Sequence, residues 1–302
     1  MAQRAVTVNG ITFSNPVLPA AGPNVRSAAL LQAAVDGGAG GIVTKTVSVR
    51  PAVDPRPTLA KGSGGGMQNC ETWSETPVEE MLEAYRAVKA RGVPLVCSLG
   101  YHPDELRTLG PLLEREVAPD ALEFSVHYVG KSLDPLLEVA RALRESVSLP
   151  LWMKLSPSIG DVEGLARAAS PFVDAFVAIN SVGPALDFDP ADCRPRLGSP
   201  WGQGWLSGPP ILPLALAFVF RVAQAQPKPV IGVGGIASGE DAAKFVAAGA
   251  SLVQVCTAAL RGGPGTYGRI DGELDAWLDA QGYANLAELR GRYATALKGG
   301  RP

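Results

Sequence analysis

The chain has 302 residues, 46% of them apolar, and its 27 lysines and arginines nearly balance 29 aspartates and glutamates. This length can bury a large core, and the formal net charge of −2 excludes the strongly basic surface that attracts nucleic acid or anionic lipid. Four widely spaced cysteines and two histidines show no metal-ligand spacing, so we expect no metal, reduced thiols and a cytoplasmic location.

The first segment, AVTVNGITF, alternates apolar and polar residues around Asn9-Gly10, a pattern typical of a β-hairpin. No apolar run of signal-peptide type precedes it. The longest apolar run, residues 211–220, contains Pro213 and ends at Arg221. We therefore expect neither secretion nor a membrane span.

Short runs rich in Val, Ile and Leu then alternate eight times with longer helical patterns. The predicted strands are residues 17–22, 41–46, 94–100, 121–127, 151–156, 174–181, 229–235 and 252–258. Helices are predicted after Ser27, after Thr76-Pro77, at Pro103 and after Ser238, where Asp241 has capping-box spacing.

Eight near-even β-then-α units favour an α/β fold, a single (β/α)8 TIM barrel over residues 1–302, and a doubly wound sheet is the alternative. We expect the hairpin at the bottom of the barrel and an extra amphipathic helix in the tail, NLAELRGRYATALK. Two connections, roughly 47–76 and 182–210, are long and rich in Gly, Pro and Trp, which is typical of functional lids or binding walls.

Small and polar residues gather where the predicted strands end. The last two predicted strands carry Gly234-Gly235 and Cys256-Thr257 at their C-terminal ends, the usual phosphate site of such barrels, although glycines can also simply form turns. Lys45 and Lys154 in apolar strands indicate an anionic or electron-rich ligand, with snorkelling to solvent as the alternative.

Other polar residues at the same strand ends could contact a ligand or exchange a proton. Asn180 and Ser181 end the sixth strand, where they are ligand contacts or ordinary turn residues. His127 and Tyr128 follow the fourth strand and could exchange a proton, or have a structural role only.

Two C-terminal segments, LSGPPILPLAL (206–216) and PVIGVGGIASGEDAAKFVAAGASLVQVCTAAL (229–260), resemble the signature of the FMN-dependent dihydroorotate dehydrogenases, especially their soluble class 1 branch. NPVLPAAG (15–22), GGIVTKTVS (40–48), MKLSPSIGD (153–161) and AINSVG (178–183) agree. The resemblance implies FMN across the barrel mouth, with Lys45 and Thr46 near the reacting ring and Lys154 at its N1/O2 edge. The implied cofactor-binding residues are Ala20, Ala21, Gly22, Lys45, Thr46, Ser125, Lys154, Ile179, Gly208, Gly234, Gly235, Cys256 and Thr257.

The family's substrate loops are altered in this chain. In the family the catalytic loop has the pattern NxSCPN, and the corresponding segment of this chain, residues 125–130, is SVHYVG. Tyr128 stands in place of the usual Cys or Ser base, and Ser125 stands in place of a substrate-binding Asn. We therefore predict His127 or Tyr128 as the proton-transfer group. A second loop, resembling NxxGLxN, reads NCETWSE, where a carboxylate at Glu75 would oppose the orotate carboxylate unless it is paired. The expected substrate contacts are Lys45, Asn69, Glu75, Asn180 and Ser181.

The leading hypothesis is hydride transfer between a substrate carbon and flavin N5, with dihydroorotate oxidised to orotate in pyrimidine biosynthesis. Alternatives are another cyclic amide or conjugated carbonyl substrate, a Schiff-base lyase using Lys154, and a flavin-binding barrel without catalysis. The resemblance further implies a small-molecule substrate and a homodimer. A separate electron-transfer subunit is one of the electron acceptors that it allows.

Overall fold

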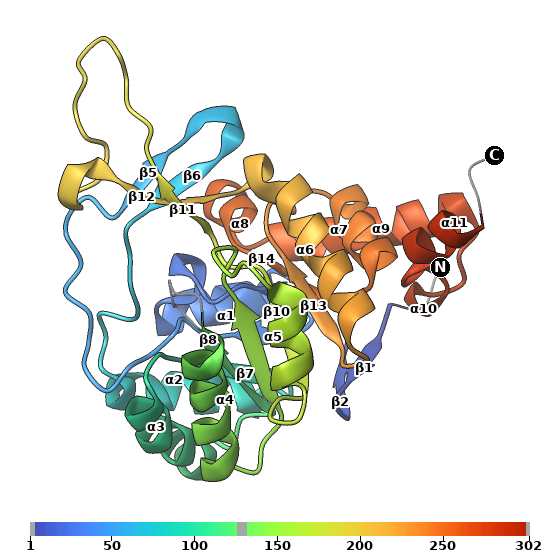
Figure 1. The fold of residues 1–302 in the computed structure, drawn as a ribbon, viewed down its shortest axis with the longest axis horizontal. Coiled ribbons are helices and arrows are strands. Elements are labelled where there is room, and N and C mark those ends of the chain that lie inside the picture. The colour runs from blue at the N-terminus through green and yellow to red at the C-terminus, as the bar shows by residue number, and fades with distance from the viewer. Residues whose placement is uncertain (1–3, 126–131, 300–302) are drawn as a thin grey trace.

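The computed structural model describes residues 4–125 and 132–299 and has a barrel of parallel strands at its centre (Figure 1). The strands are hydrogen-bonded in the order β3-β14-β13-β10-β9-β8-β7-β4. They are β3 (Val17–Pro19), β4 (Ile42–Val43), β7 (Leu95–Leu99), β8 (Ala121–Ser125), β9 (Leu151–Leu155), β10 (Ala175–Ala178), β13 (Val230–Val233) and β14 (Ala250–Val255). All eight predicted strands are confirmed within the described residues, although residues 126–127 of the fourth lie outside them and the eighth ends before α8, which begins at Thr257. The Gly40 N–H donates to the Val17 carbonyl at 3.0 Å, which brings the two outermost strands together and nearly closes the barrel.

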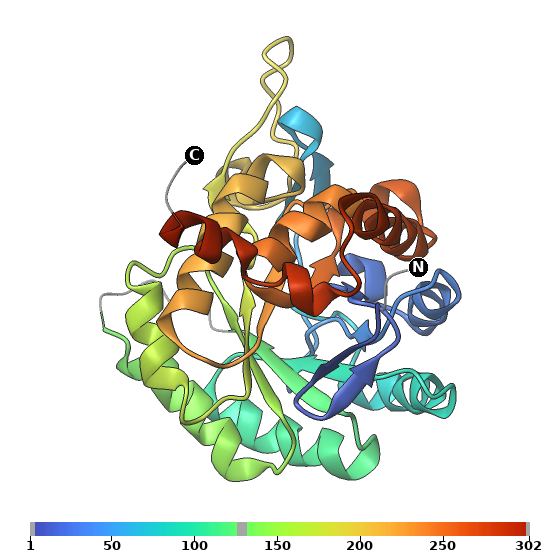
Figure 2. The same ribbon diagram turned by 90° about the vertical axis from the view of Figure 1, so that its right-hand side faces the viewer.

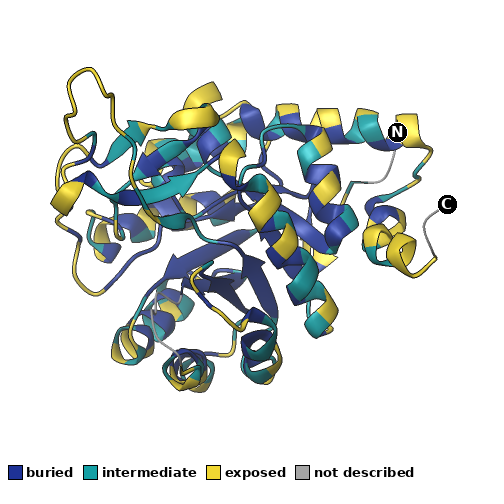
Figure 3. Cartoon of the chain, turned by 45° about the horizontal axis from the view of Figure 1, so that its top comes forward, coloured by how far each residue is buried: buried dark blue, intermediate teal, exposed yellow. Residues whose placement is uncertain are grey.

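Helices surround the barrel and turn one face toward it. They are α1 (Ala28–Asp36), α2 (Val78–Ala90), α3 (Pro103–Glu116), α4 (Asp134–Ser146), α5 (Val162–Ala169), α6 (Leu212–Ala225), α7 (Gly239–Ala248), α8 (Thr257–Gly262) and α9 (Thr266–Gln281), with 3-10 turns at Pro23–Val25, Ser63–Gly65, Pro200–Gly202 and Pro209–Ile211. Figure 3 shows the strands buried and the outer helix faces exposed. The predicted capping box of Ser238 and Asp241 opens α7. Within residues 4–125 and 132–299, no helix is long and apolar enough to cross a membrane.

The N-terminal hairpin is confirmed and lies against the lower end of the barrel. It consists of β1 (Val6–Val8) and β2 (Ile11–Phe13), joined by Asn9 and Gly10, which both have positive φ. The Asn9 side chain accepts from Trp152 Nε1 and donates to the Asp174 carbonyl, both at 3.0 Å. Because Phe13 and Trp152 belong to the apolar cluster inside the barrel, the hairpin seals the end away from the site.

The two long connections form a second sheet that the sequence did not predict. Its strands are β5 (Leu59–Lys61), β6 (Met67–Asn69), β11 (Val182–Ala185) and β12 (Gly204–Ser207), antiparallel in the order β11-β12-β6-β5. Figure 1 shows this sheet beyond one end of the barrel, with the excursion 186–203 extending from it. The long connections were expected to form a lid or a wall of a binding site. They form an antiparallel sheet and not the irregular loops that were expected.

The C-terminal tail is not the single extra helix that we predicted. Gly291, with φ 76°, separates α10 (Leu286–Leu289) from α11 (Arg292–Lys298), and its N–H donates to the Val246 carbonyl of α7. Figure 2 shows both helices on the outside of the molecule, and α10 shares a surface hollow with Val6 and Thr7 of the N-terminal hairpin. The glycine turn changes the direction of the chain, so that α10 buries Leu286 and Leu289 while α11 has no buried residue.

Candidate active site

A pocket opens at the carboxyl ends of the barrel strands and encloses about 940 Å³, open solvent at its mouth included. The second sheet forms one side of it through Asn69, Trp205 and Ser207. The predicted cofactor-binding residues all line this pocket: Ala20, Ala21, Gly22, Lys45, Thr46, Ser125, Lys154, Ile179, Gly208, Gly234, Gly235, Cys256 and Thr257.

The glycine-rich side of the pocket presents free backbone amides. Gly234 and Gly235 have φ of 129° and 84°, and within the described residues their N–H groups donate no hydrogen bond. A Cβ on Gly235 would lie 2.8 Å from the Leu212 backbone nitrogen, so the fold itself requires glycine here. The glycines are therefore needed to form the turn, and the turn also leaves their N–H groups free to donate to an anion. Both interpretations of the two glycines hold.

The end of β14 supplies small polar groups to the same side. The Thr257 hydroxyl lies 2.8 Å from the Ser207 hydroxyl, and the Cys256 thiol donates to Asn24 Oδ1 at 3.1 Å. Burial raises the pKa of the Cys256 thiol to about 11, against the opposing effect of the nearby Lys45 and Lys154 ammonium groups. Cys256 is therefore a neutral contact at physiological pH and not a thiolate nucleophile.

Lys154 at the pocket floor has a buried carboxylate partner. Its Nζ lies 3.3 Å from Glu123 Oε1, and Gln254 Nε2 donates to the other Glu123 oxygen at 2.6 Å. The Glu123 side chain is completely buried, and Gln254 Oε1 is buried without a partner in the described structure. We did not identify Glu123 or Gln254 from sequence, although a charged residue inside the apolar run ALEFS was a signal of the same kind as Lys154.

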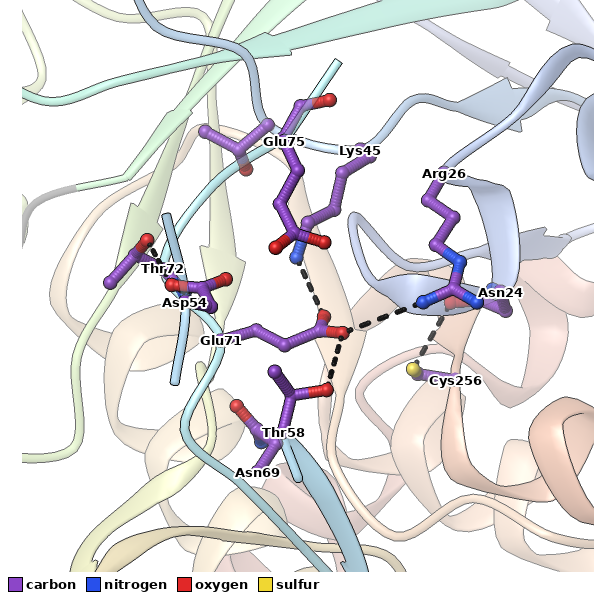
Figure 4. A network of polar contacts seen from close by, with 12 residues as sticks. Asn24, Arg26, Lys45, Asp54, Thr58, Asn69, Glu71, Thr72, Glu75 and Cys256 are labelled. Atoms are coloured by element: carbon purple, nitrogen blue, oxygen red, sulfur yellow. Dashed lines mark hydrogen bonds and ion pairs between the residues drawn. The ribbon is translucent and has the colours of Figure 1, made fainter. Parts of the chain in front are cut away.

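Lys45 also has a carboxylate partner, and that partner is Glu71. Lys45 Nζ donates to Glu71 Oε2 at 2.9 Å, Thr58 Oγ1 lies 3.5 Å from Oε1, and an Arg26 guanidinium nitrogen lies 3.9 Å from it (Figure 4). The Lys45 and Glu71 side chains are 9% and 8% exposed, and both line the pocket. Sequence reasoning pointed to Glu75 in the same loop and missed Glu71.

Glu75 lies outside the pocket lining. Both its carboxylate oxygens accept from Arg56 at 2.6 Å, and the side chain is 38% exposed. The Arg56 hydrogen bond is the main reason that the pKa of Glu75 is lowered. Trp73 from the same loop also turns away, since its Nε1 donates to the Arg50 carbonyl at 2.7 Å.

The remaining expected substrate contacts line the pocket. Asn69 donates to the Trp205 carbonyl at 3.3 Å, and the Ser181 N–H donates to Asn180 Oδ1 at 2.9 Å. His127 and Tyr128 lie outside the described residues. Among the described lining residues Glu71 is the one carboxylate, and burial raises the pKa of the neighbouring Tyr101 hydroxyl.

A nearly closed parallel barrel, with free amides at the glycine turn after β13 and two lysines in the pocket at the strand ends, is the arrangement of a (β/α)8-barrel enzyme that binds a phosphate-bearing ligand. The family model described as dihydroorotate dehydrogenase matches residues 126–278. The chain therefore belongs to the dihydroorotate dehydrogenase family, which by its name comprises oxidoreductases acting on a CH–CH bond.

Relatives match over nearly their whole length. The catalytic subunit of dihydroorotate dehydrogenase B (NAD(+)) from Methanothermobacter thermautotrophicus is 32% identical over 94% of this chain and 96% of its own. The subunit of the same name from Geobacter sulfurreducens is 34% identical over 95% and 97%. That from Methanosarcina mazei is 32% identical over 94% and 93%. The family resemblance expected from the sequence motifs is confirmed.

Proposed function

We propose that the protein is an FMN-dependent oxidoreductase of dihydroorotate dehydrogenase type, which oxidises dihydroorotate to orotate in pyrimidine biosynthesis. The observation that carries the proposal is the convergence of every expected cofactor-binding residue on one pocket at the strand ends. Family membership and the names of the relatives support the same reaction.

The residues present fit FMN. The free amides of Gly234 and Gly235 suit its phosphate, and Ala20, Ala21 and Gly22 leave room for a flat ring. Lys154 and the unpaired Gln254 Oε1 offer a donor and an acceptor to a heterocycle. FMN, when bound, supplies N5 as the hydride acceptor.

The chain's own groups must position the substrate and remove a proton. Asn69, Asn180 and Ser181 offer amide and hydroxyl groups to the polar edge of a pyrimidine ring. His127 and Tyr128 remain our prediction for the group that accepts the substrate proton. Lys154 forms an ion pair with Glu123, whereas a Schiff-base lyase needs this amine neutral, so the oxidoreductase is the better fit.

A second candidate keeps the chemistry and changes the substrate to another cyclic amide or conjugated carbonyl compound. Glu71 favours it, because its carboxylate already pairs with Lys45, which is itself an expected substrate contact. We further propose a cytoplasmic homodimer that passes electrons to a separate subunit. The four free cysteines support a reducing compartment, and the relatives named as catalytic subunits support a separate electron-transfer subunit.

The test is an anaerobic absorbance spectrum of the FMN-supplemented protein before and after dihydroorotate is added. A flavin band that bleaches supports the proposal. A band that bleaches only with dithionite would retain the flavin site and reject dihydroorotate as substrate. The absence of any flavin band would reject the cofactor.

A further inference from the structure

The surroundings of Glu71 form a site for an anion that the protein's own side chain already fills. Lys45, Thr58 and Arg26 approach its carboxylate from three separate segments of the chain, at 2.9, 3.5 and 3.9 Å (Figure 4). Two hydrogen-bond donors and a further cation around one position suit a carboxylate-bearing ligand. In this chain the carboxylate comes from the NCETWSE loop.

A substrate carboxylate that binds Lys45 must therefore meet Glu71. A carboxylate oxygen takes up a position about 2.7–2.9 Å from an ammonium nitrogen. Two oxygens on the same Nζ, one of them Glu71 Oε2 at 2.9 Å, are then at most about 6 Å apart. Like charges within about 4–6 Å disfavour each other strongly when water is scarce, and the Glu71 side chain is only 8% exposed.

A ring without a carboxylate meets no such repulsion. A carboxylate has about four lone-pair positions, and Glu71 can accept a further hydrogen bond from an amide N–H of a neutral cyclic substrate. Asn69, two residues earlier in the same loop, lines the same pocket and can donate to a ring carbonyl. The pair of Lys45 and Glu71 therefore lowers the affinity for an acidic dihydropyrimidine, such as dihydroorotate, relative to a neutral one.

We propose that Glu71 is a specificity-determining residue, which competes with a substrate carboxylate for Lys45 and shifts the preference of the pocket toward neutral dihydropyrimidine rings. This inference rests on the proposed function for the identity of the ring. It concerns the charge of the substrate and leaves the hydride chemistry unchanged.

The test compares orotate with uracil, the same ring without the carboxylate, in calorimetric binding to the FMN-supplemented protein. We expect the wild type to bind uracil at least as tightly as orotate. Glu71→Gln keeps the size of the side chain and removes its charge, so it should tighten orotate at least tenfold and change uracil by less than about threefold. The matched control, Glu79→Gln on the exposed face of α2, should change neither.

Flavin bleaching by dihydroorotate and by 5,6-dihydrouracil is measured in parallel on the same variants. Bleaching by dihydroorotate without any change in the ratio of orotate to uracil affinity on Glu71→Gln overturns the inference and retains the proposed function. A shifted affinity ratio without bleaching by dihydroorotate retains the inference and overturns the proposed function. The wild-type ratio tests the inference even if Glu71→Gln does not fold, because tighter orotate than uracil binding in the wild type contradicts it.

Discussion

Replacing Glu123 by glutamine tests the buried ion pair beneath the pocket. Glu123 and Lys154 lie 3.3 Å apart, and their side chains are 0% and 5% exposed. Glutamine keeps the shape of the side chain and removes its charge. The Lys154 ammonium is then left in the barrel without a counter-charge, and an amide N–H can face it.

The magnitude follows from this geometry. Two unit charges 3.3 Å apart attract by about 5 kcal/mol at an effective dielectric constant of about 20. Removing one partner of a buried pair costs about 3–5 kcal/mol in practice. We expect Glu123→Gln to lower the free energy of unfolding by about 3 kcal/mol, the lower end of this range. Lys154 also lines the pocket, so water can reach its ammonium group.

The assay is urea unfolding of the flavin-free protein, followed by tryptophan fluorescence. The control is Glu163→Gln, which breaks the surface ion pair between Glu163 and Arg221. Because these side chains are 29% and 41% exposed, the control should lower the free energy of unfolding by less than about 1 kcal/mol. Adding Lys154→Met to Glu123→Gln should recover most of the loss, since it removes the uncompensated charge. Equal losses in Glu123→Gln and Glu163→Gln would refute the reasoning.

Three further changes test other parts of the molecule. Gly235→Ala puts a Cβ at φ 84° and 2.8 Å from backbone, so urea unfolding should show a loss above about 2 kcal/mol, against about 1 for Gly92→Ala, which has φ 70° and open space. Burial opposes the charge on Glu105, but hydrogen bonds from two backbone amides and a hydroxyl outweigh it and lower its pKa. The charged Glu105 therefore stabilises the fold fully above its ordinary pKa of about 4.3, and this stabilisation is lost as the pH falls through the lower pKa of the folded state. Glu105→Gln should flatten the profile of unfolding free energy against pH in this acidic range. With a pKa of about 11, Cys256 should resist iodoacetamide at neutral pH while exposed Cys193 is labelled, and equal labelling by mass spectrometry would contradict this.

The barrel could be predicted from sequence because its strands are continuous apolar runs. The second sheet could not, because its strands are three or four residues long and its two halves join across a great sequence distance, as Trp205 pairs with Asn69. Alternation cannot be recognised over three residues, and nothing local indicates which segments will pair. The break at Gly291 was visible as a glycine inside the pattern but was read as part of one helix.

The residues of the site likewise include some that could be predicted from sequence and some that could not. Gly235 and Lys45 could be placed because they follow or end predicted strands, and strand ends share one face of a barrel. Glu71 and Glu75 lie four residues apart in an irregular loop without periodicity, so sequence could not tell which of them turns inward. The difference depends on distant partners, Lys45 for one and Arg56 for the other.

Both lysines that suggested an anionic ligand already have carboxylate partners, but the two pairs differ in what can replace those partners. Glu123 is completely buried and does not line the pocket, so a ligand above Lys154 cannot take its place from the pocket side. Glu71 lines the pocket itself, and Arg26 beside it is 55% exposed, so a ligand can compete for the same donors. A substitution at Glu71 therefore alters the charge offered to the substrate, whereas the charge on the proposed cofactor side stays fixed. Such a separation allows substrate preference to change within this family while the cofactor site is retained.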